Sequence, residues 1–137
     1  MERSSEVANV IVRFYEAFSV GTAEAFDSVV SRDPDAMALG TDRRLDDRKA
    51  WKATFLGLGG VAVERGEIQG FRDGSLGWIV DDPTYVAPDG RRLRMRLTAV
   101  TRQEDDGWKL VQLHISVAVP DEVALAEAAG WESAAPS

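Results

Sequence analysis

The chain has 137 residues, of which 45% are hydrophobic and 28% charged, a composition typical of one ordinary globular domain rather than a disordered or fibrous chain. Its formal net charge of -7 disfavours contact with phosphate backbones and acidic lipids, so we expect neither nucleic acid nor a membrane as a partner. Cysteine is absent, the N-terminus has no signal-peptide pattern, and no apolar run approaches the roughly 20 residues that span a bilayer, so the sequence predicts a cytoplasmic protein without disulfides.

The N-terminal part of the sequence has the spacing of helices. Apolar residues recur every three or four positions from Ser5 to Val20, which predicts an amphipathic helix. Gly21 suits the left-handed position that ends a helix, and Thr22 can cap a second helix. Asp33-Pro34-Asp35 then ends this second helix.

A short strand and a third helix are predicted next. Ala36 to Gly40 is apolar enough for a brief strand, and Thr41 to Asp47 is a charged connection. Asp46 is the predicted cap of a helix that carries Trp51 and Phe55 on one side. Repeated glycines stop this helix, because glycine costs backbone entropy in a helix.

The second half of the sequence has the two-residue period of strands, punctuated by turns, as in an antiparallel meander. Asp82-Pro83 makes the second of its strands irregular or places that strand at an edge. A short closing helix is expected over Asp121 to Ala129, followed by a frayed tail. The four predicted strands run over Val61 to Phe71, Leu76 to Val86, Arg91 to Gln103, and Trp108 to Val119.

Helices followed by strands predict an α+β fold in which the helices cover one face of a curved sheet. In the last two strands, aliphatic and polar residues alternate, so the two kinds should point to opposite faces. The aliphatic residues that we expect to face the helices are Leu93, Met95, Leu97, Ala99, Val111, Leu113, Ile115 and Val117. The residues expected on the outer face, as a sheet surface or subunit interface, include Arg94, Arg96, Thr98, His114 and Ser116.

Two segments of this meander have a more specific pattern. One is Gly-Ser-Leu-Gly-Trp78-Ile-Val, and the other runs from Arg96-Leu-Thr98-Ala-Val into Gly107-Trp108-Lys-Leu-Val-Gln-Leu-His114-Ile-Ser116. With them the chain resembles, over nearly its whole length, the SnoaL-like branch of the nuclear transport factor 2-like superfamily. This superfamily includes ketosteroid isomerase, polyketide cyclases, dehydratases and the association domain of calcium/calmodulin-dependent kinase II.

The resemblance implies a cone-shaped α+β fold, with three N-terminal helices packed on a curved, mainly antiparallel sheet. Residues 1–137 would form a single domain with a core of about 5–120. The open end of such a cone is hard to fill with side chains, so the resemblance also implies a largely apolar cavity. Trp78 stays open between the cavity wall and a dimer face. The residues expected to line the cavity are Met37, Leu39, Trp51, Phe55, Trp78, Leu97 and Ile115.

An isomerase of this family is expected to have a carboxylate base just after the short strand and an oxyanion donor, commonly Tyr, on the first helix. Those positions fall near Gly40 and Phe14 in this sequence. Asp42 and Tyr15 are their nearest substitutes and are the candidate catalytic residues. The structural alternatives are a solvated or capping Asp42 and a core Tyr15 with its hydroxyl at the cavity mouth.

His114 is the only histidine, which excludes a multi-histidine metal site, and we expect neither a metal nor a cofactor. Ser116 lies two residues further along the same strand, where side chains are roughly 6 to 7 Å apart, too far for a direct bond to His114. Both residues therefore suit a polar contact between subunits.

Three functions remain open at this point, and the sequence does not decide whether the protein is an enzyme. The first is a SnoaL-like domain that holds a small, mainly apolar molecule in its cone and forms a homodimer through its sheet. The second is a cofactor-independent isomerase, cyclase or dehydratase that acts on a steroid- or polyketide-like carbonyl compound. The third is an assembly module without a ligand.

Overall fold

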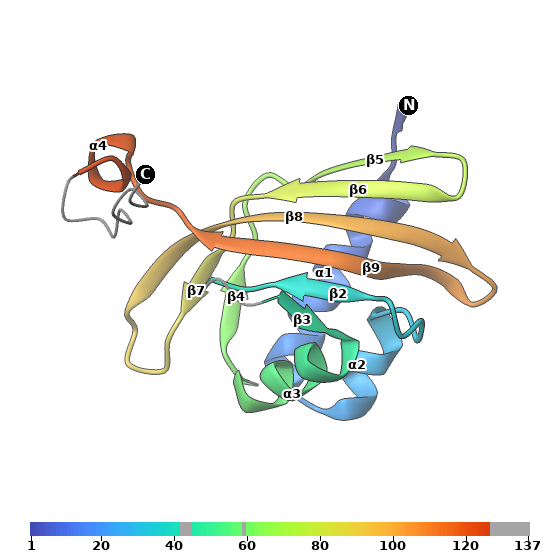
Figure 1. Cartoon of the computed structure of the whole chain (residues 1–137), viewed down its shortest axis with the longest axis horizontal. Helices are drawn as coiled ribbons and strands as arrows, with labels where there is room; N and C mark the ends of the chain where they lie inside the picture. Colours follow the sequence, from blue (N-terminus) through green and yellow to red (C-terminus); the bar gives the residue numbers. More distant parts are fainter. Residues whose placement is uncertain (42–44, 59, 127–137) are drawn as a thin grey trace, which may run out of the picture.

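The computed structural model describes residues 1–41, 45–58 and 60–126, and it shows helices packed on one side of a long, curved sheet (Figure 1). The helices come first in the chain and the long strands last, so the fold is α+β as predicted. None of the described helices is long and apolar enough to cross a membrane.

Helix α1 (Ser5–Val20) has the predicted bounds because both of its ends are capped. The Ser4 hydroxyl accepts a hydrogen bond from the Val7 backbone N–H at 3.1 Å, and Gly21 adopts the left-handed conformation with φ 75°. One face of the helix is buried against the sheet, which is what its apolar spacing predicts.

Helix α2 (Ala23–Val29) begins after Thr22, whose hydroxyl accepts from the Ala25 N–H at 3.2 Å, as predicted. The predicted cap of helix α3 (Arg48–Leu58) is wrong by one residue. The cap is Asp47, whose Oδ1 accepts from the Ala50 N–H at 2.9 Å. Asp46 instead lies in a short strand and is buried.

This unpredicted strand, β3 (Leu45–Asp47), pairs with β2 (Met37–Leu39) in an antiparallel hairpin. Strand β2 also pairs with the last strand, β9 (Gly107–Val117), in a parallel arrangement. The other neighbour of β9 in the sheet is the long strand β8 (Arg92–Glu104). The β2–β3 hairpin therefore extends the sheet on the side where α3 begins.

Two of the predicted strands are each divided in two. The first becomes β4 (Ala62–Glu64) and β5 (Gln69–Asp73), and the second becomes β6 (Leu76–Asp81) and β7 (Thr84–Val86). Strand β5 pairs with β6, and β4 pairs with β7, so both breaks fall at the same level of the sheet. Pro83 has no N–H to donate at this level. The main order is β1 (Glu2–Arg3), β5, β6, β8, β9, β2 and β3, while β7 joins β4 to β8.

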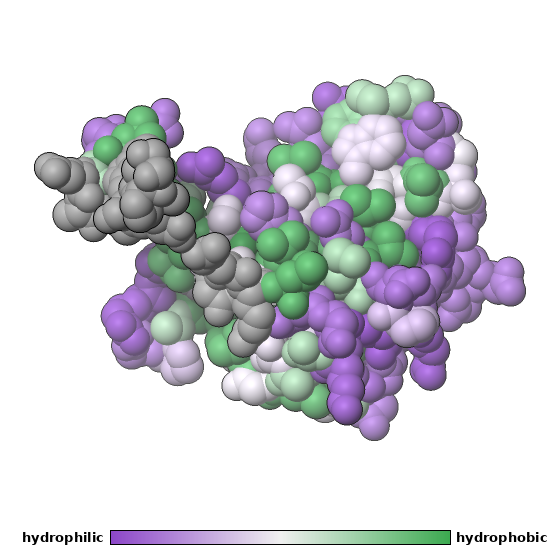
Figure 2. All heavy atoms as spheres, viewed as in Figure 1, coloured by the Kyte–Doolittle hydropathy of each residue, from purple (hydrophilic) through white to green (hydrophobic). Residues whose placement is uncertain are grey.

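The alternation in β8 and β9 is confirmed at the end that approaches α3. Leu97 is buried there, while Arg96 and His114 are exposed on the outer face. The register shifts at one point, where Val100 pairs with Gln112 but the next residue pairs with Leu110. Val111 is thus an extra residue in β9, and the prediction that it faces inward is wrong. Figure 2, in the orientation of Figure 1, shows hydrophobic residues among polar ones on the side of the molecule that faces the viewer.

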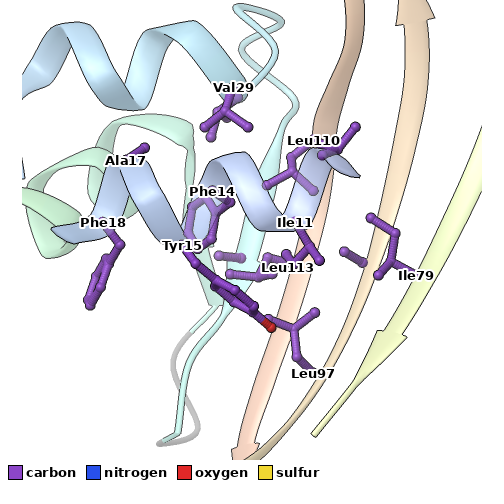
Figure 3. Packing of buried hydrophobic residues seen from close by; sticks show 14 of the residues in the cluster. Ile11, Phe14, Tyr15, Ala17, Phe18, Val29, Ile79, Leu97, Leu110 and Leu113 are labelled. Carbon is purple, nitrogen blue, oxygen red and sulfur yellow. The ribbon is translucent and has the colours of Figure 1, made fainter. Parts of the chain in front are cut away.

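The core lies between α1 and the inner face of the sheet. Figure 3 shows Ile11 and Phe14 pointing from α1 toward Leu110 and Leu113 on β9. A cluster of aromatic rings continues this core toward α2 and α3, with centroids 5.1 to 6.3 Å apart. The rings that meet there are those of Phe14, Phe18, Phe26, Trp51 and Phe55.

Candidate functional site: an apolar cavity

A cavity of about 290 Å³ lies beyond this aromatic cluster. Its wall is built by α1, α3, the β2–β3 hairpin and the inner faces of β7, β8 and β9. Most of the lining side chains are aromatic or aliphatic. This largely apolar lining distinguishes the cavity from the more polar hollows elsewhere on the described part of the chain.

Aromatic rings form much of the cavity wall and hold one another in place. The Phe14 ring lies 6.1 Å from the Trp51 ring and 5.9 Å from the Phe55 ring. On the other side, Phe18 stacks on Tyr85 with centroids 5.8 Å apart. The wall is therefore a rigid surface on which a flat apolar molecule can pack.

Asp46 contributes a carboxylate to this apolar wall. In β3 its side chain points inward, while Leu45 and Asp47 are exposed on the opposite side, so the strand alternation selects Asp46 for the cavity. Its side chain accepts a hydrogen bond from the Thr54 hydroxyl at 3.3 Å, and the residue is only 5% exposed. Such a carboxylate can accept a hydrogen bond or a proton from a bound molecule.

Tyr85 is the second titratable side chain that the structure describes at the cavity wall. It belongs to β7 and lies opposite Val63 on β4 and Leu93 on β8. Burial raises the pKa of the Tyr85 hydroxyl to about 12. The phenol is therefore protonated at neutral pH and is available as a hydrogen-bond donor.

The structure places the predicted cavity residues in three different environments. Trp51, Phe55, Leu39 and Ile115 line the cavity together. Leu97 is buried in the core without reaching the cavity surface. The other two predicted residues, Met37 and Trp78, lie outside the cavity.

Met37 and Trp78 lie on the outer face of the sheet, which corrects their predicted place in the cavity. Met37 pairs with Gln112 in β9, so it shares the outer face with the polar residues of that strand. Trp78 lies between two inward-facing positions of β6 and stacks on Phe71, with ring centroids 6.0 Å apart. The structure thereby settles the ambiguity of Trp78 in favour of the outer face.

The Tyr15 hydroxyl is committed to a partner outside the cavity. It donates a hydrogen bond to Asp81 Oδ2 at 2.6 Å, and Asp81 Oδ1 accepts from the Gly66 N–H at 3.0 Å. Burial, and then the bond to Asp81, hold the pKa of Tyr15 well above its ordinary value. Figure 3 shows the Tyr15 oxygen at the tip of the side chain, beside Leu97. We call this arrangement the Tyr15–Asp81 tie, because it fastens α1 to β6.

The other candidate catalytic residue, Asp42, lies outside the described residues. The two positions that an isomerase of this fold would use are occupied by Phe14 and Gly40, and both line the cavity. Neither side chain can donate or accept a proton. The acid–base groups described at the cavity are thus Asp46 and Tyr85 rather than the predicted pair.

The five polar residues predicted for the outer face lie on β8 and β9. Thr98 is directly opposite His114, and Arg96 is opposite Ser116. The Arg96 guanidinium also donates to the Val119 carbonyl at 3.3 Å. Arg94 is exposed at the next outward position. These side chains lie on the face of the sheet opposite the cavity.

Residues 7–120 match the family model described as a SnoaL-like domain, whereas no curated protein matches the sequence. Solved structures match this chain in fold. A protein of the NTF2-like family from Streptomyces avermitilis, provisionally described as a dehydratase, is 16% identical with a TM-score of 0.73, over 84% of this chain and 95% of that chain.

A provisionally described ketosteroid isomerase from Parabacteroides distasonis is also 16% identical, with a TM-score of 0.67 over 81% of this chain and 86% of that one. A protein with a cystatin-like fold from Caulobacter vibrioides is 18% identical, with a TM-score of 0.69 over 86% and 91% of the two chains. At such low identity these likenesses show the fold alone.

Proposed function

This chain belongs to the SnoaL-like domain family, and we propose that it binds a small, mainly apolar molecule in the cavity between its helices and its sheet. The observation that supports this is the cavity itself, about 290 Å³ in volume and walled mainly by aromatic and aliphatic side chains. Ligand sites usually measure about 300–1000 Å³, so the volume favours a compact ligand of one or two rings. An assembly module without a ligand would need no such space.

The test is a cavity-filling substitution with a matched control. Ala38 lines the cavity and is buried, whereas Ala62 is exposed on β4. We expect 2-isopropenylnaphthalene, a neutral apolar probe, to bind the native protein and to quench Trp51, a cavity residue. Ala38→Leu should abolish binding, and Ala62→Leu should leave it unchanged.

Ile115→Phe fills the same cavity from β9 and guards against a failure of Ala38→Leu to fold. Circular dichroism identifies the folded variants. The proposal would be wrong if the native protein bound no probe, or if both cavity-filling variants folded and bound it as tightly as the native protein does.

We also propose that two copies associate through the outer face of the sheet. Leu76 and Val80 on β6 are 50% and 46% exposed there, beside the stacked Phe71 and Trp78. An exposed apolar patch bordered by polar residues is typical of a protein interface, and symmetric dimers are the commonest assemblies of soluble proteins. The polar border includes Thr98, which pairs with Val80.

Two exposed valines provide the test of the dimer. Val80 lies on the outer face, whereas Val20 is 63% exposed at the end of α1. We expect Val80→Arg to convert a dimer into a monomer in sedimentation analysis, and Val20→Arg to have no effect. A native protein that sediments as a monomer at high concentration would contradict this part of the proposal.

Asp46 favours a second candidate function, that of a cofactor-independent isomerase, cyclase or dehydratase acting on a steroid- or polyketide-like carbonyl compound. A buried carboxylate in an apolar cavity is suited to remove a proton next to a carbonyl group. Deuterium exchange at the methyl group of 2-acetylnaphthalene, followed by NMR in D₂O, measures this step alone. Enzymatic exchange that survives in Asp46→Asn would exclude Asp46 as the base.

A further inference from the structure

Beyond the end of β9 the chain leaves the sheet. The Ala118 N–H donates a hydrogen bond to the Arg94 carbonyl at 3.0 Å, which is the last backbone bond between this strand and β8. The short helix α4 (Asp121–Ala124) follows and lies clear of the other helices and of the sheet (Figure 1). Every residue from 119 to 126 is exposed. We call residues 119–126 the α4 arm.

The α4 arm exposes large apolar side chains beside acidic ones. Val119, Val123 and Leu125 are its exposed apolar residues, and Leu125 is the most exposed of them at 65%. Asp121 and Glu122 lie in the first turn of α4, so each is about one helical turn before Leu125 and lies on the same side of the arm. A surface that fits this side of the arm must offer apolar contact next to positive charge.

The apolar patch on the outer face of the sheet has that chemistry. Its edge carries a positive charge, because the Arg3 guanidinium lies 5.2 Å from the centre of the Phe71 ring. Arg3 is exposed and has no carboxylate partner within the part of the chain that the structure describes. We call this surface the outer patch, and its apolar members are Phe71, Leu76, Trp78 and Val80.

The α4 arm cannot reach the far end of the outer patch in its own chain. Leu76 pairs with Arg102 on β8. Val117, the last residue of β9, pairs with Met95, which is seven residues or roughly 23 Å away along β8. Three extended residues and α4 carry Leu125 only about 18 Å from Val117. Figure 1 shows α4 beyond one end of the sheet and the β5–β6 turn at the other, so a contact between Leu125 and Leu76 must join two chains.

One stacking of two outer faces brings the α4 arm and the outer patch together twice. When the strands of the two sheets run in opposite senses, the end that carries the arm lies over the end of the partner that carries the patch. A two-fold axis makes the two contacts identical. Stacking in the same sense would instead bring arm to arm, where the carboxylates of the two copies repel each other.

We propose that the α4 arm of each copy packs on the outer patch of the other copy, with Leu125 against the partner's Leu76 and Glu122 beside the partner's Arg3. This inference rests on the dimer proposed above. It adds which segment covers the patch and in which sense the two sheets stack.

Cross-linking between engineered cysteines tests the contact, because the chain has no cysteine of its own. A variant with both Leu76→Cys and Leu125→Cys, treated with bismaleimidoethane, should run as a covalent dimer on a denaturing gel. Each single variant should run as a monomer, since two copies of the same residue lie at opposite ends of the stacked sheets. Cross-linking of Leu125→Cys alone would show stacking in the same sense and would overturn the inference.

A matched pair of leucine substitutions measures the contribution of the arm. Leu125→Asp should raise the dimer dissociation constant at least about ten-fold in sedimentation analysis, because one leucine is lost from each of the two contacts. Leu56→Asp changes an exposed leucine of α3, away from the outer face, and should leave the constant unchanged. Circular dichroism checks that both variants fold, which we expect because α4 has no buried residue.

Charge reversal tests the polar half of the contact. Glu122→Arg should weaken the dimer about two- to five-fold, the effect of exposed ion pairs, and Arg3→Glu should do the same. The variant that carries both changes should regain the native affinity. Weakening that adds in the double variant would show that Glu122 and Arg3 do not meet.

The outcomes separate this inference from the dimer on which it rests. A native dimer that gives no cross-link in the double-cysteine variant, or that is unaffected by Leu125→Asp, would overturn the inference and leave an outer-face dimer intact. A native protein that sediments as a monomer would overturn the dimer itself.

Discussion

Two regions of the cone each contain a tyrosine and a buried aspartate, and they use these residues differently. In the Tyr15–Asp81 tie, the phenol and the carboxylate satisfy each other, and Gly66 completes the arrangement. At the cavity, the partly buried Tyr85 and the buried Asp46 lie in the same wall, and the Asp46 carboxylate accepts a hydrogen bond from the Thr54 hydroxyl. The same two residue types therefore serve folding where they meet, and they suit the binding of a molecule where they border empty space.

The largest difference between the two regions should appear when the acceptor of the tie is removed. Asp81→Ala leaves the Tyr15 hydroxyl without a partner in the interior and removes the acceptor of the Gly66 N–H, which belongs to an exposed residue. A buried unsatisfied group costs about 1–3 kcal/mol and a lost hydrogen bond about 1 kcal/mol, so we expect the free energy of unfolding to fall by about 2–4 kcal/mol. Urea unfolding measures the loss, and a loss below the range for one such group would show that solvent reaches the tie.

A smaller difference is expected between the two tyrosines. Tyr15→Phe removes the hydrogen bond to Asp81 and should lower the free energy of unfolding by about 1–3 kcal/mol. Tyr85→Phe removes a hydroxyl that has no partner among residues 1–41, 45–58 and 60–126, so its effect should be near zero or slightly stabilising. Similar losses in the two variants would mean that the two hydroxyls are in equivalent environments, and the comparison would fail.

The smallest effect concerns stability at alkaline pH. Burial raises the pKa of Tyr85 to about 12 from an ordinary value of 10.0, so the folded state holds its proton over a range in which the unfolded state has lost it. The stability that this provides is complete below pH 10.0 and decreases between pH 10.0 and about 12. Burial and the hydrogen bond to Asp81 raise the pKa of Tyr15 still further, so its contribution to stability is also lost as the pH rises.

Tyr85→Phe should therefore flatten part of the fall in stability above pH 10.0, as followed by urea unfolding at a series of pH values. Absorbance at the tyrosinate band checks the order of ionisation, with Tyr85 before Tyr15. If Tyr15 ionised first while the protein remained folded, the tie would not be sealed from solvent.

Local signals in the sequence account for the features that were predicted correctly. The caps at Gly21 and Thr22 act within one turn of α1 and α2, and the alternation of β8 follows from neighbouring residues alone. Both are decided by interactions that are short along the chain. The division into helices first and strands afterwards follows from the same periodicity.

The wrong predictions at the candidate site have two causes. Some contacts join residues that are distant along the chain, and in some strands the sequence does not reveal which side chains point inward. The partner of Tyr15 is 66 residues away, and no local pattern indicates it. Tyr85 lies seven residues after Trp78 and therefore on the opposite side of the sheet, so its side could be assigned only once that of Trp78 was known. Two adjacent aspartates precede α3, and the alternation of a three-residue strand decides which of them becomes the cap.

The outer face illustrates the same limit. Trp78 had two possible sides until the partners of β6 were known, and the stacking on Phe71 comes from a strand whose predicted bounds were wrong. The polar residues of β8 and β9 needed no such knowledge, because they belong to one uninterrupted alternation at that end of the sheet.

The extra residue at Val111 has a consequence for how this protein can change. On one side of it, Leu110 and Trp108 are fully packed against the helices, and on the other side Leu113 and Ile115 reach the cavity. Removing Val111 would place Leu110 and Gln112 as consecutive residues opposite Thr101 and Val100, so the inward side chains of both halves of the strand would keep their faces. A single inserted residue thus lets two inward side chains three positions apart serve the same face of the sheet, and the strand can lose that residue without turning either half over.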